Sequence, residues 1–502
     1  MYRRQCTQQL EFSDFYLPFS GHLDPENRWI QLTRLVPWQL AEEIYHEDLC
    51  EDSGAPIVPA RTALGALLVK ERLGLTDRET VEAIQENPYL QFFIGLEEFT
   101  PDKPFDASLM VDFRKRFGEE GMRRIALASV PQSETSGEGD QPSSADAPPD
   151  RAAHRASDSA EQPNRGQLIV DATCAPADIR YPTDVSLLNE AREKTDALID
   201  SLHEPLVGQQ PRPRTYRVKA RRQFVAFVRQ KKPGRNKIRQ AKRQQLGCLQ
   251  RNLQAIDRLL VHPGALPLAR FSRRQYKDLL VCRELYRQQQ QMYDQCTQRV
   301  DDRIVSIHQP HVRPIKRGKA GRDTEFGAKL SASVVDGFAF VDRLSWDNYN
   351  ESQDLIGQIE RYQERFGFYP ESVHVDQIYR TRENRAYCQQ RGIRMSGPPL
   401  GRPPHTVSRE AKRQAAADEA IRNQVEGKFG QAKRRFGLGR VMAKLAGTST
   451  AQILLTFLMM NLERALQLLF FVLVWLAPRW LTTVPRHSPR HHQPDQRRLS
   501  PA

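Results

Sequence analysis

The sequence predicts an α/β protein with a mixed-sheet core, a helical basic insertion within that core, and an all-α domain before it. Two apolar runs, Gln167–Asp171 and Ser372–Asp376, each end in an aspartate and have the length of a buried strand. Residues 1–125 instead carry apolar side chains at helical spacing. Because 502 residues are too many for one compact core, we expect about two to four domains.

Residues 1–130 are predicted to form a helical domain. The segment Arg61–Lys70 has a continuous apolar stripe, and the residues from Gly74 to Asp77 end that helix and cap a second one at Arg78–Glu86. Two helices joined by a short glycine-containing turn resemble a helix-turn-helix. Two roles therefore stay open for this domain: contact with DNA, or a structural or dimerising role.

A change of composition divides the chain after this domain. Residues 131–165 are rich in Gly, Pro and Ser, so they cannot bury enough apolar surface to offset chain entropy. We expect a disordered linker there, a second folded domain at 166–480, and a disordered tail at 481–502.

The second domain is interrupted by a long insertion at about 186–300. The stretch Arg212–Arg243 holds fourteen Lys and Arg and no acidic residue, with aromatic side chains between them. Such density favours contact with a phosphate backbone, although a disordered basic loop is the alternative. The candidate DNA contacts are Arg212, Arg214, Lys219, Arg221, Arg222, Lys231 and Lys232.

The rest of the insertion has the spacing of packed helices. Apolar residues recur three and four apart from Leu246 to Leu260, a turn follows at His262–Gly264, and a second helix is expected at Arg273–Arg299. We expect these two helices to form an antiparallel hairpin.

Strand patterns resume after the insertion at Arg303–Ile307 and Phe326–Val335. Asp336-Gly337 is a hairpin-turn dipeptide, and Phe338–Val341 follows as the return strand. A helix at Ser352–Phe366 then precedes the strand that ends at Asp376. This order predicts a mixed sheet with helices on its faces, as in an RNase H-like domain.

Charge and cysteine usage indicate the partner and the compartment. The formal net charge of +14 favours a polyanionic partner, and seven scattered cysteines without metal-ligand spacing fit a reducing cytosol. The N-terminus has no signal-peptide core. The apolar runs 453–460 and 466–476 are separated by charged residues, so we expect a buried helix and no membrane span.

Three acids are the candidate catalytic residues. Asp171 and Asp376 are each expected at the C-terminal tip of a buried strand, where α/β folds commonly place their chemistry. Glu426 shares a helix face with Arg422 and with Lys433, two turns further on. Taken alone, that face is typical of a surface ion-pair ladder.

Together, Asp171, Asp376 and Glu426 suit two Mg²⁺ ions, with Mn²⁺ as a substitute, acting on phosphodiesters. Arg422 and Lys433 would then bind DNA phosphates beside the scissile bond.

These residues carry a resemblance to bacterial insertion-sequence transposases of the DDE type, from the branch with a Y-x2-R-x3-E-x6-K signature. The R, E and K of the signature are matched by Arg422, Glu426 and Lys433. The position of the Tyr is held by Glu419, which is a departure from the pattern. Val375–Asn384 resembles the family's second-Asp motif and Gln167–Thr173 its first, and residues 30–125 are similar to the family's N-terminal domain.

The resemblance implies a magnesium-dependent enzyme that binds double-stranded DNA, both the terminal inverted repeats of its element and target DNA. It would cleave and transfer strands by hydrolysis and transesterification, act as a homodimer, and reside in the cytoplasm at the nucleoid. Two other functions stay open: a transposase-derived protein that binds DNA without cutting it, and a stand-alone nuclease of the RNase H-like class.

Overall fold

The computed structural model describes residues 11–47, 57–130, 163–262, 268–316, 324–397 and 408–476. Of the predicted linker at 131–165, only the last three residues fall within these ranges. The predicted tail at 481–502 lies wholly outside them.

The described chain before residue 131 is helical, as predicted. Thr76 begins α4 with a capping box that involves Glu79, and Gly74 ends α3 in the left-handed conformation (φ 69°). The structure therefore contains the two helices and the short glycine-containing turn that the sequence predicted. A role of this pair in DNA contact stays a prediction. The helical elements are η1 (Phe12–Asp14), η2 (Pro18–Ser20), α1 (Arg28–Thr33), α2 (Trp38–His46), α3 (Ala60–Leu73), α4 (Asp77–Glu86), α5 (Pro88–Phe93) and α6 (Leu109–Ala128).

A mixed sheet forms the centre of the molecule. Its strands are β1 (Gln167–Pro176), β2 (Arg313–Lys316), β3 (Thr324–Val335), β4 (Phe338–Ser345), β5 (Ser372–His374) and β6 (Arg394–Met395). β1 pairs with β3 in antiparallel fashion and with β5 in parallel fashion, while β2 and β4 both pair with β3 and β6 pairs with β5. Asp336 and Gly337 both have positive φ in the β3–β4 turn, as predicted for this dipeptide.

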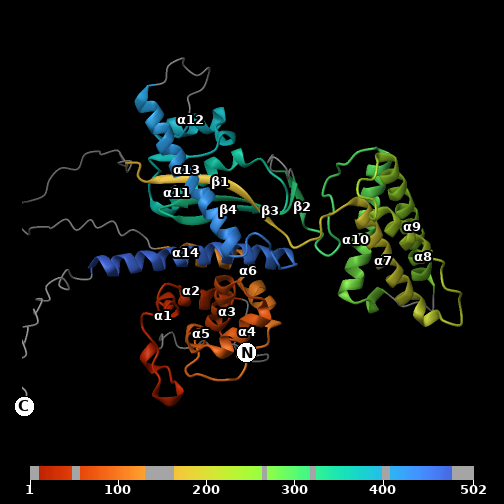
Figure 1. The fold of residues 1–502 in the computed structure, drawn as a ribbon, viewed down its shortest axis with the longest axis horizontal. Coiled ribbons are helices and arrows are strands. Elements are labelled where there is room, and N and C mark those ends of the chain that lie inside the picture. Colours follow the sequence, from red (N-terminus) through yellow and green to blue (C-terminus); the bar gives the residue numbers. More distant parts are fainter. Residues whose placement is uncertain are drawn as a thin grey trace, which may run out of the picture.

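Helices cover both faces of the sheet (Figure 1). Alternate β1 residues face opposite ways: Leu168 and Val170 pack with α11 (Leu355–Phe366) and α12 (Arg382–Gln390), with η5 (Glu351–Gln353) and η6 (Gln377–Tyr379) beside these helices. Ile169 belongs to the core that contains α13 (Arg409–Arg435) and α14 (Ala446–Leu476). The predicted fold class, an RNase H-like mixed sheet after a helical N-terminal region, is confirmed.

The insertion is a bundle of four helices that stands beside the sheet (Figure 1). The helices are α7 (Asp184–His203), α8 (Arg217–Val228), α9 (Arg235–Val261) and α10 (Arg273–Asp294), with short turns η3 (Glu204–Leu206) and η4 (Leu268–Arg270). The predicted two-helix hairpin is therefore incomplete, because α9 packs on α7 as well as on α10. Leu188, Ile199 and Leu202 of α7 share the core of the bundle with Leu249 and Ile256 of α9.

Two predictions about individual elements are wrong. Residues 303–307 do not form a strand: Ile304 and Ile307 are buried against the bundle without a paired backbone. The helix expected from Ser352 begins at Leu355, after the short turn η5. The apolar runs at 453–460 and 466–476 form the single helix α14, as expected for a buried helix.

α14 joins the N-terminal helices to the sheet (Figure 1). It packs on α6 and α3 and on β4, and the side-chain amide of Asn461 bonds to both backbone groups of Ala339 (2.8 and 2.9 Å). Its residues 446–470 are long and apolar enough to cross a membrane, but 67% of that window is buried inside the protein. This burial matches the predicted core helix.

Glu71 of α3 is a fully buried acid at the contact with α14. Its Oε2 lies 3.4 Å from the Thr456 hydroxyl, and burial raises the pKa of Glu71 from 4.5 to about 7. The folded protein therefore holds a proton at Glu71 more tightly than the unfolded chain does. Stability should fall as the pH rises from about 4.5 to about 7.

We predict that Glu71→Gln raises the free energy of unfolding at pH 8 by about 3 kcal/mol and leaves it unchanged near pH 4, because glutamine does not ionise. Urea denaturation across this pH range measures the effect. Glu82→Gln, at an exposed position of α4, is the control. Identical pH dependence in wild type and Glu71→Gln would contradict the prediction.

Candidate active site

Asp171 and Asp376 lie at equivalent positions of two paired strands. The parallel ladder between β1 and β5 ends at the pair Ile169–His374. Each aspartate comes two residues after its member of that pair, so both carboxylates lie where the two strands part. The register thus brings together two residues that are far apart in the sequence.

The local setting of Asp171 differs from the prediction. Asp171 was expected at the tip of a strand, but β1 continues to Pro176, paired with β3 beyond the point where β5 ends. The small buried residues Ala172, Cys174 and Ala175 allow this extension. Asp376 does follow the end of β5, where its Oδ1 accepts a hydrogen bond from the Gln377 N–H (2.7 Å) and begins η6.

Glu426 reaches this region from α13. Val425 and Phe429 bury one side of the helix against the core, and Glu426 next to them has a side chain that is 57% exposed. Arg422 donates to Glu419 (2.6 Å) and to Glu426 (3.1 Å). The ion-pair ladder is therefore present on this helix face, and the catalytic role of Glu426 stays a prediction.

One cavity of about 720 Å³, called the acidic cavity below, is lined by all three acids and by Arg422 and Lys433. Sequence reasoning missed seven of its polar residues: Thr173 on β1, Lys316 on β2, Lys329 on β3, Asn348, Tyr349 and Asn350 before η5, and Glu351 in η5. Only their position in the fold identifies them, since the loop from 346 to 350 has no periodic pattern.

The charges around this cavity act on Asp171. The pKa of Asp171 is raised to about 6, first by burial and also by the negative charges of Glu351 and Asp376, while the Ala172 N–H and Arg422 oppose the shift. Tyr379, which is fully buried, lies close enough to Glu351 and Asp171 for their charges to raise its pKa as well, after burial. In the described chain its hydroxyl has no hydrogen-bond partner.

The donor chemistry fits a hard divalent cation, because several carboxylates share one partly buried, polar cavity. Within the described ranges, however, no three acidic, His or Cys side chains are already grouped closely enough to hold an ion. Glu426 is turned toward Arg422, so its carboxylate would have to shift to share an ion with Asp171.

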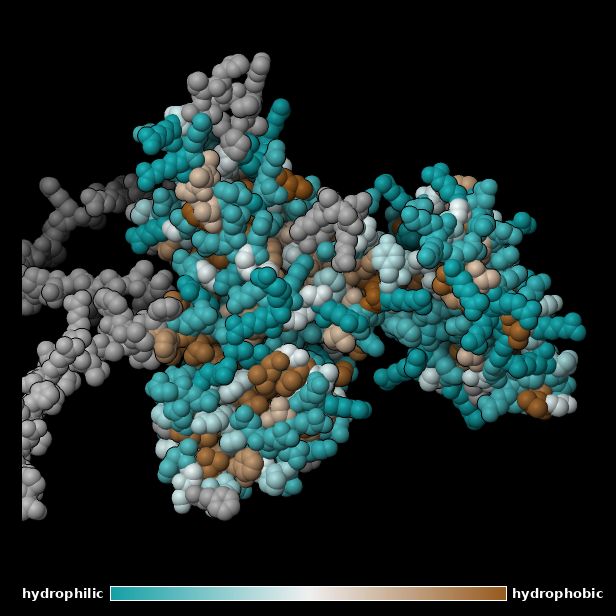
Figure 2. All heavy atoms as spheres, viewed as in Figure 1, coloured by the Kyte–Doolittle hydropathy of each residue, from teal (hydrophilic) through white to brown (hydrophobic). Residues whose placement is uncertain are grey.

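The seven predicted DNA contacts of the insertion are all exposed. Arg212 forms an ion pair with Asp200, together with Arg217 (2.8 Å). Lys219, Arg221 and Arg222 lie on α8, and Lys231 and Lys232 follow it. Figure 2 shows that the visible face of the bundle is mainly hydrophilic. None of the seven lines the acidic cavity, so the structure separates them from the candidate catalytic residues.

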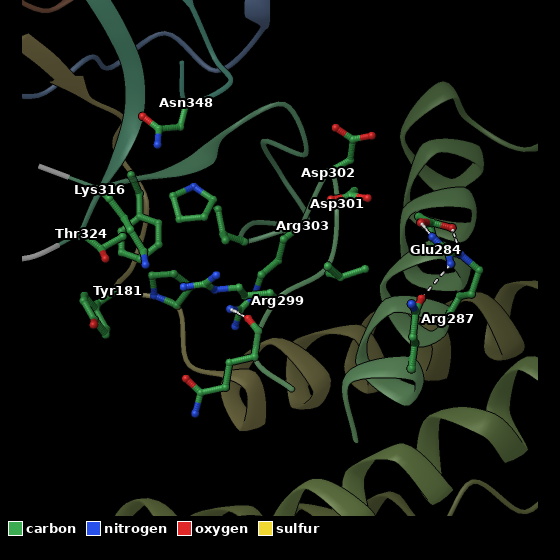
Figure 3. Close-up of a pocket in the computed structure, with 17 residues that line it drawn as sticks. Tyr181, Glu284, Arg287, Arg299, Asp301, Asp302, Arg303, Lys316, Thr324 and Asn348 are labelled. Atoms are coloured by element: carbon green, nitrogen blue, oxygen red, sulfur yellow. Dashed lines mark hydrogen bonds and ion pairs between the residues drawn. The ribbon is translucent and has the colours of Figure 1, made fainter. Parts of the chain in front are cut away.

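A larger cavity of about 1150 Å³ lies between the bundle and the sheet (Figure 3). Glu284 and Arg287 line it from α10, and Lys316 and Asn348 line it from the sheet side. Because Lys316 and Asn348 also line the acidic cavity, the two cavities adjoin.

Comparison with known proteins gives matches in both parts of the chain. Residues 373–463 match the family described as "Transposase DDE domain", and residues 18–116 match "Transposase domain (DUF772)". The chain is similar to "Uncharacterized protein ORF8 in nfe locus" of Rhizobium meliloti, at 32% identity over 169 residues, which are 34% of this chain and 71% of that protein. No solved structure matches.

The fold, the acidic cavity and these matches define a DDE transposase. The chain belongs to the insertion-sequence DDE transposases, as its resemblance implied.

Asn384 of α12 holds two turns of the site together. Its Nδ2 donates to the backbone oxygens of Ser352 in η5 (2.8 Å) and Tyr379 in η6 (2.7 Å), and the residue is only 3% exposed. This contact gives a physical reason for the asparagine that ends the segment resembling the second-Asp motif.

We predict that Asn384→Ala lowers the free energy of unfolding by about 2–4 kcal/mol, because two buried carbonyl oxygens lose their donor. Urea denaturation measures the change, and Asn236→Ala, at an exposed position of α9, controls for loss of an asparagine. Equal free energies of unfolding for the two variants would show that the hydrogen bonds of Asn384 do not stabilise the fold.

Proposed function

We propose that this transposase binds the ends of its element and cleaves and transfers DNA strands at the acidic cavity. The observation that carries the proposal is the register of β1 and β5, which sets Asp171 and Asp376 side by side under the helix that bears Glu426. DNA binding and both chemical steps are part of the proposal.

Asp171, Asp376 and Glu426 would hold two Mg²⁺ ions, which Mn²⁺ can replace. Carboxylate oxygens are the ligands that such hard cations prefer. Bound there, the cations would activate the attacking oxygen and neutralise charge on the phosphate. The raised pKa of Asp171, due first to burial and then to the negative charges of Glu351 and Asp376, is consistent with this assignment, since a bound cation would stabilise the ionised carboxylate.

Arg422 and Lys433 would bind the phosphates beside the scissile bond. Both residues line the cavity. The side chain of Arg422 is 19% exposed, and its ion pairs with Glu419 and Glu426 hold the guanidinium in place. Glu419 occupies the position of the signature's Tyr and here serves as a second anion for Arg422. A planar guanidinium fixed in this way can approach a phosphate as a fork.

DNA beyond the cleaved bond would follow the positive surface of the insertion. Lys316 and Arg299 line the adjoining cavity, and the exposed cations of α8 extend the same charge over the bundle. Each phosphate neutralised in this way would make binding more sensitive to salt. The partners would be terminal inverted repeats and target DNA, bound by a homodimer in the cytoplasm, since two ends must be brought together.

The test is Mg²⁺-dependent cleavage of DNA that carries the element's own terminal repeat. We predict that Glu426→Gln reduces the cleavage rate by at least about 100-fold, because one ligand of the cations is lost, while binding of the same DNA is retained. Gel assays of cleaved and bound DNA measure both effects.

Glu410→Gln, in the first turn of α13 and exposed, is the matched control and should cleave like wild type. Cleavage by Glu426→Gln at the control rate would remove Glu426 from the mechanism. Binding without cleavage by the wild type itself would support the non-cutting alternative.

A further inference from the structure

We infer that Glu351 is a fourth carboxylate of the cation site, in addition to Asp171, Asp376 and Glu426. The inference rests on the proposed function, because it assigns a further residue to the same site. Three observations support it: the place of Glu351 in the cavity, the rigidity of its turn, and an unsatisfied buried hydroxyl near it.

Glu351 lines the same cavity as the three predicted acids. It opens η5, directly after Asn350, whose side chain accepts a hydrogen bond from the Ser352 N–H (3.2 Å). The Glu351 side chain is 21% exposed, compared with 57% for Glu426. Glu351 is therefore the more enclosed of the two glutamates at this cavity.

The turn that bears Glu351 is fastened to the turn that bears Asp376. η5 packs directly on η6, and Asn384 donates one hydrogen bond to each of them, at Ser352 and Tyr379. Since Asp376 immediately precedes η6, its distance from Glu351 is fixed by buried hydrogen bonds. A fixed spacing between two carboxylates is what a shared cation requires.

Lys329 orients Glu351 without removing its negative charge from the site. The Lys329 Nζ lies 2.9 Å from a Glu351 carboxylate oxygen and donates to the Tyr349 carbonyl (2.8 Å), and its side chain is 11% exposed. Lys329 is one of four cations that line the cavity, with Lys316, Arg422 and Lys433, so its role toward Glu351 is to set the direction of the carboxylate.

Asp354 shows how a purely structural acid behaves in the same region. It is buried, pairs with Arg343 (2.7 Å), accepts a hydrogen bond from the Ser331 hydroxyl (2.5 Å), and does not line the cavity. Glu351, in contrast, faces the cavity and two other acids. The buried Tyr379 hydroxyl, which lacks a hydrogen-bond partner among the described residues, lies near Glu351 and Asp171 as well as near Asp354.

The test is binding of Mn²⁺ to the full-length protein without DNA, measured by isothermal titration calorimetry. We predict that Glu351→Gln weakens Mn²⁺ binding at least about tenfold, because one charged ligand is lost. Glu364→Gln, at an exposed position of α11, is the matched control and should bind like wild type. Circular dichroism confirms that each variant is folded.

The double variant Glu351→Gln with Lys329→Gln separates a ligand from a simple salt-bridge partner. If Glu351 only neutralised Lys329, removing both charges would restore Mn²⁺ affinity, and this result would overturn the inference. The inference predicts that the double variant stays weak and that Glu351→Asp, which keeps the charge, recovers part of the affinity.

The outcomes also separate this inference from the proposed function. Wild type that binds Mn²⁺ and cleaves DNA, with Glu351→Gln equal to the Glu364→Gln control in Mn²⁺ affinity, overturns the role of Glu351 alone. Wild type that neither binds Mn²⁺ nor cleaves DNA overturns both.

Discussion

The burial of α14 between the N-terminal helices and the sheet is the interaction on which the rest of the structure depends. Its apolar side chains belong to one continuous core that contains residues of α3, α6, β3, β4 and α13. A helix with so much apolar surface must be covered on nearly every side, and only the joint packing of all these elements covers it. The N-terminal helices and the sheet are thus held together by shared burial.

The few polar residues of α14 set the position of the helix that bears Glu426. The Thr456 hydroxyl lies 2.9 Å from the Phe436 carbonyl, at the end of α13. Glu463 is buried and forms ion pairs with Arg72 of α3 and Arg435 of α13. Because removing one member of a buried ion network leaves a charge uncompensated, these contacts fix α13 firmly over β1. The site therefore depends on the N-terminal helices as well as on the sheet.

Much of this arrangement could be predicted from local sequence. Asp336-Gly337 specified its hairpin, and the segment from Gly74 to Asp77 indicated where α3 ends and α4 begins, because turn and cap chemistry act within a few residues. The candidate acids were found because two of them end apolar runs in the sequence and the third shares a helix face with two cations. Their presence around one cavity follows from the β1–β5 register.

Other features depend on contacts that the sequence does not encode locally. β1 extends past Asp171 because β3 continues to pair with it after β5 has ended. Residues 303–307 have a strand-like pattern, yet they are buried against the bundle without pairing. Glu351 lies in a polar turn without periodicity, so only the packing of η5 on η6 reveals its place beside Asp171 and Asp376. Long-range packing decides these three cases.

The central claim is that divalent cations bind in the cavity formed by β1, η5, the start of η6 and α13. Crystals grown with Mn²⁺ and measured at the manganese absorption edge would locate the ions directly. We predict anomalous peaks within about 2.5 Å of carboxylate oxygens of Asp171 and Asp376, with Glu351 or Glu426 completing the ligands. Manganese bound only elsewhere on the protein, with this cavity empty, would contradict the account.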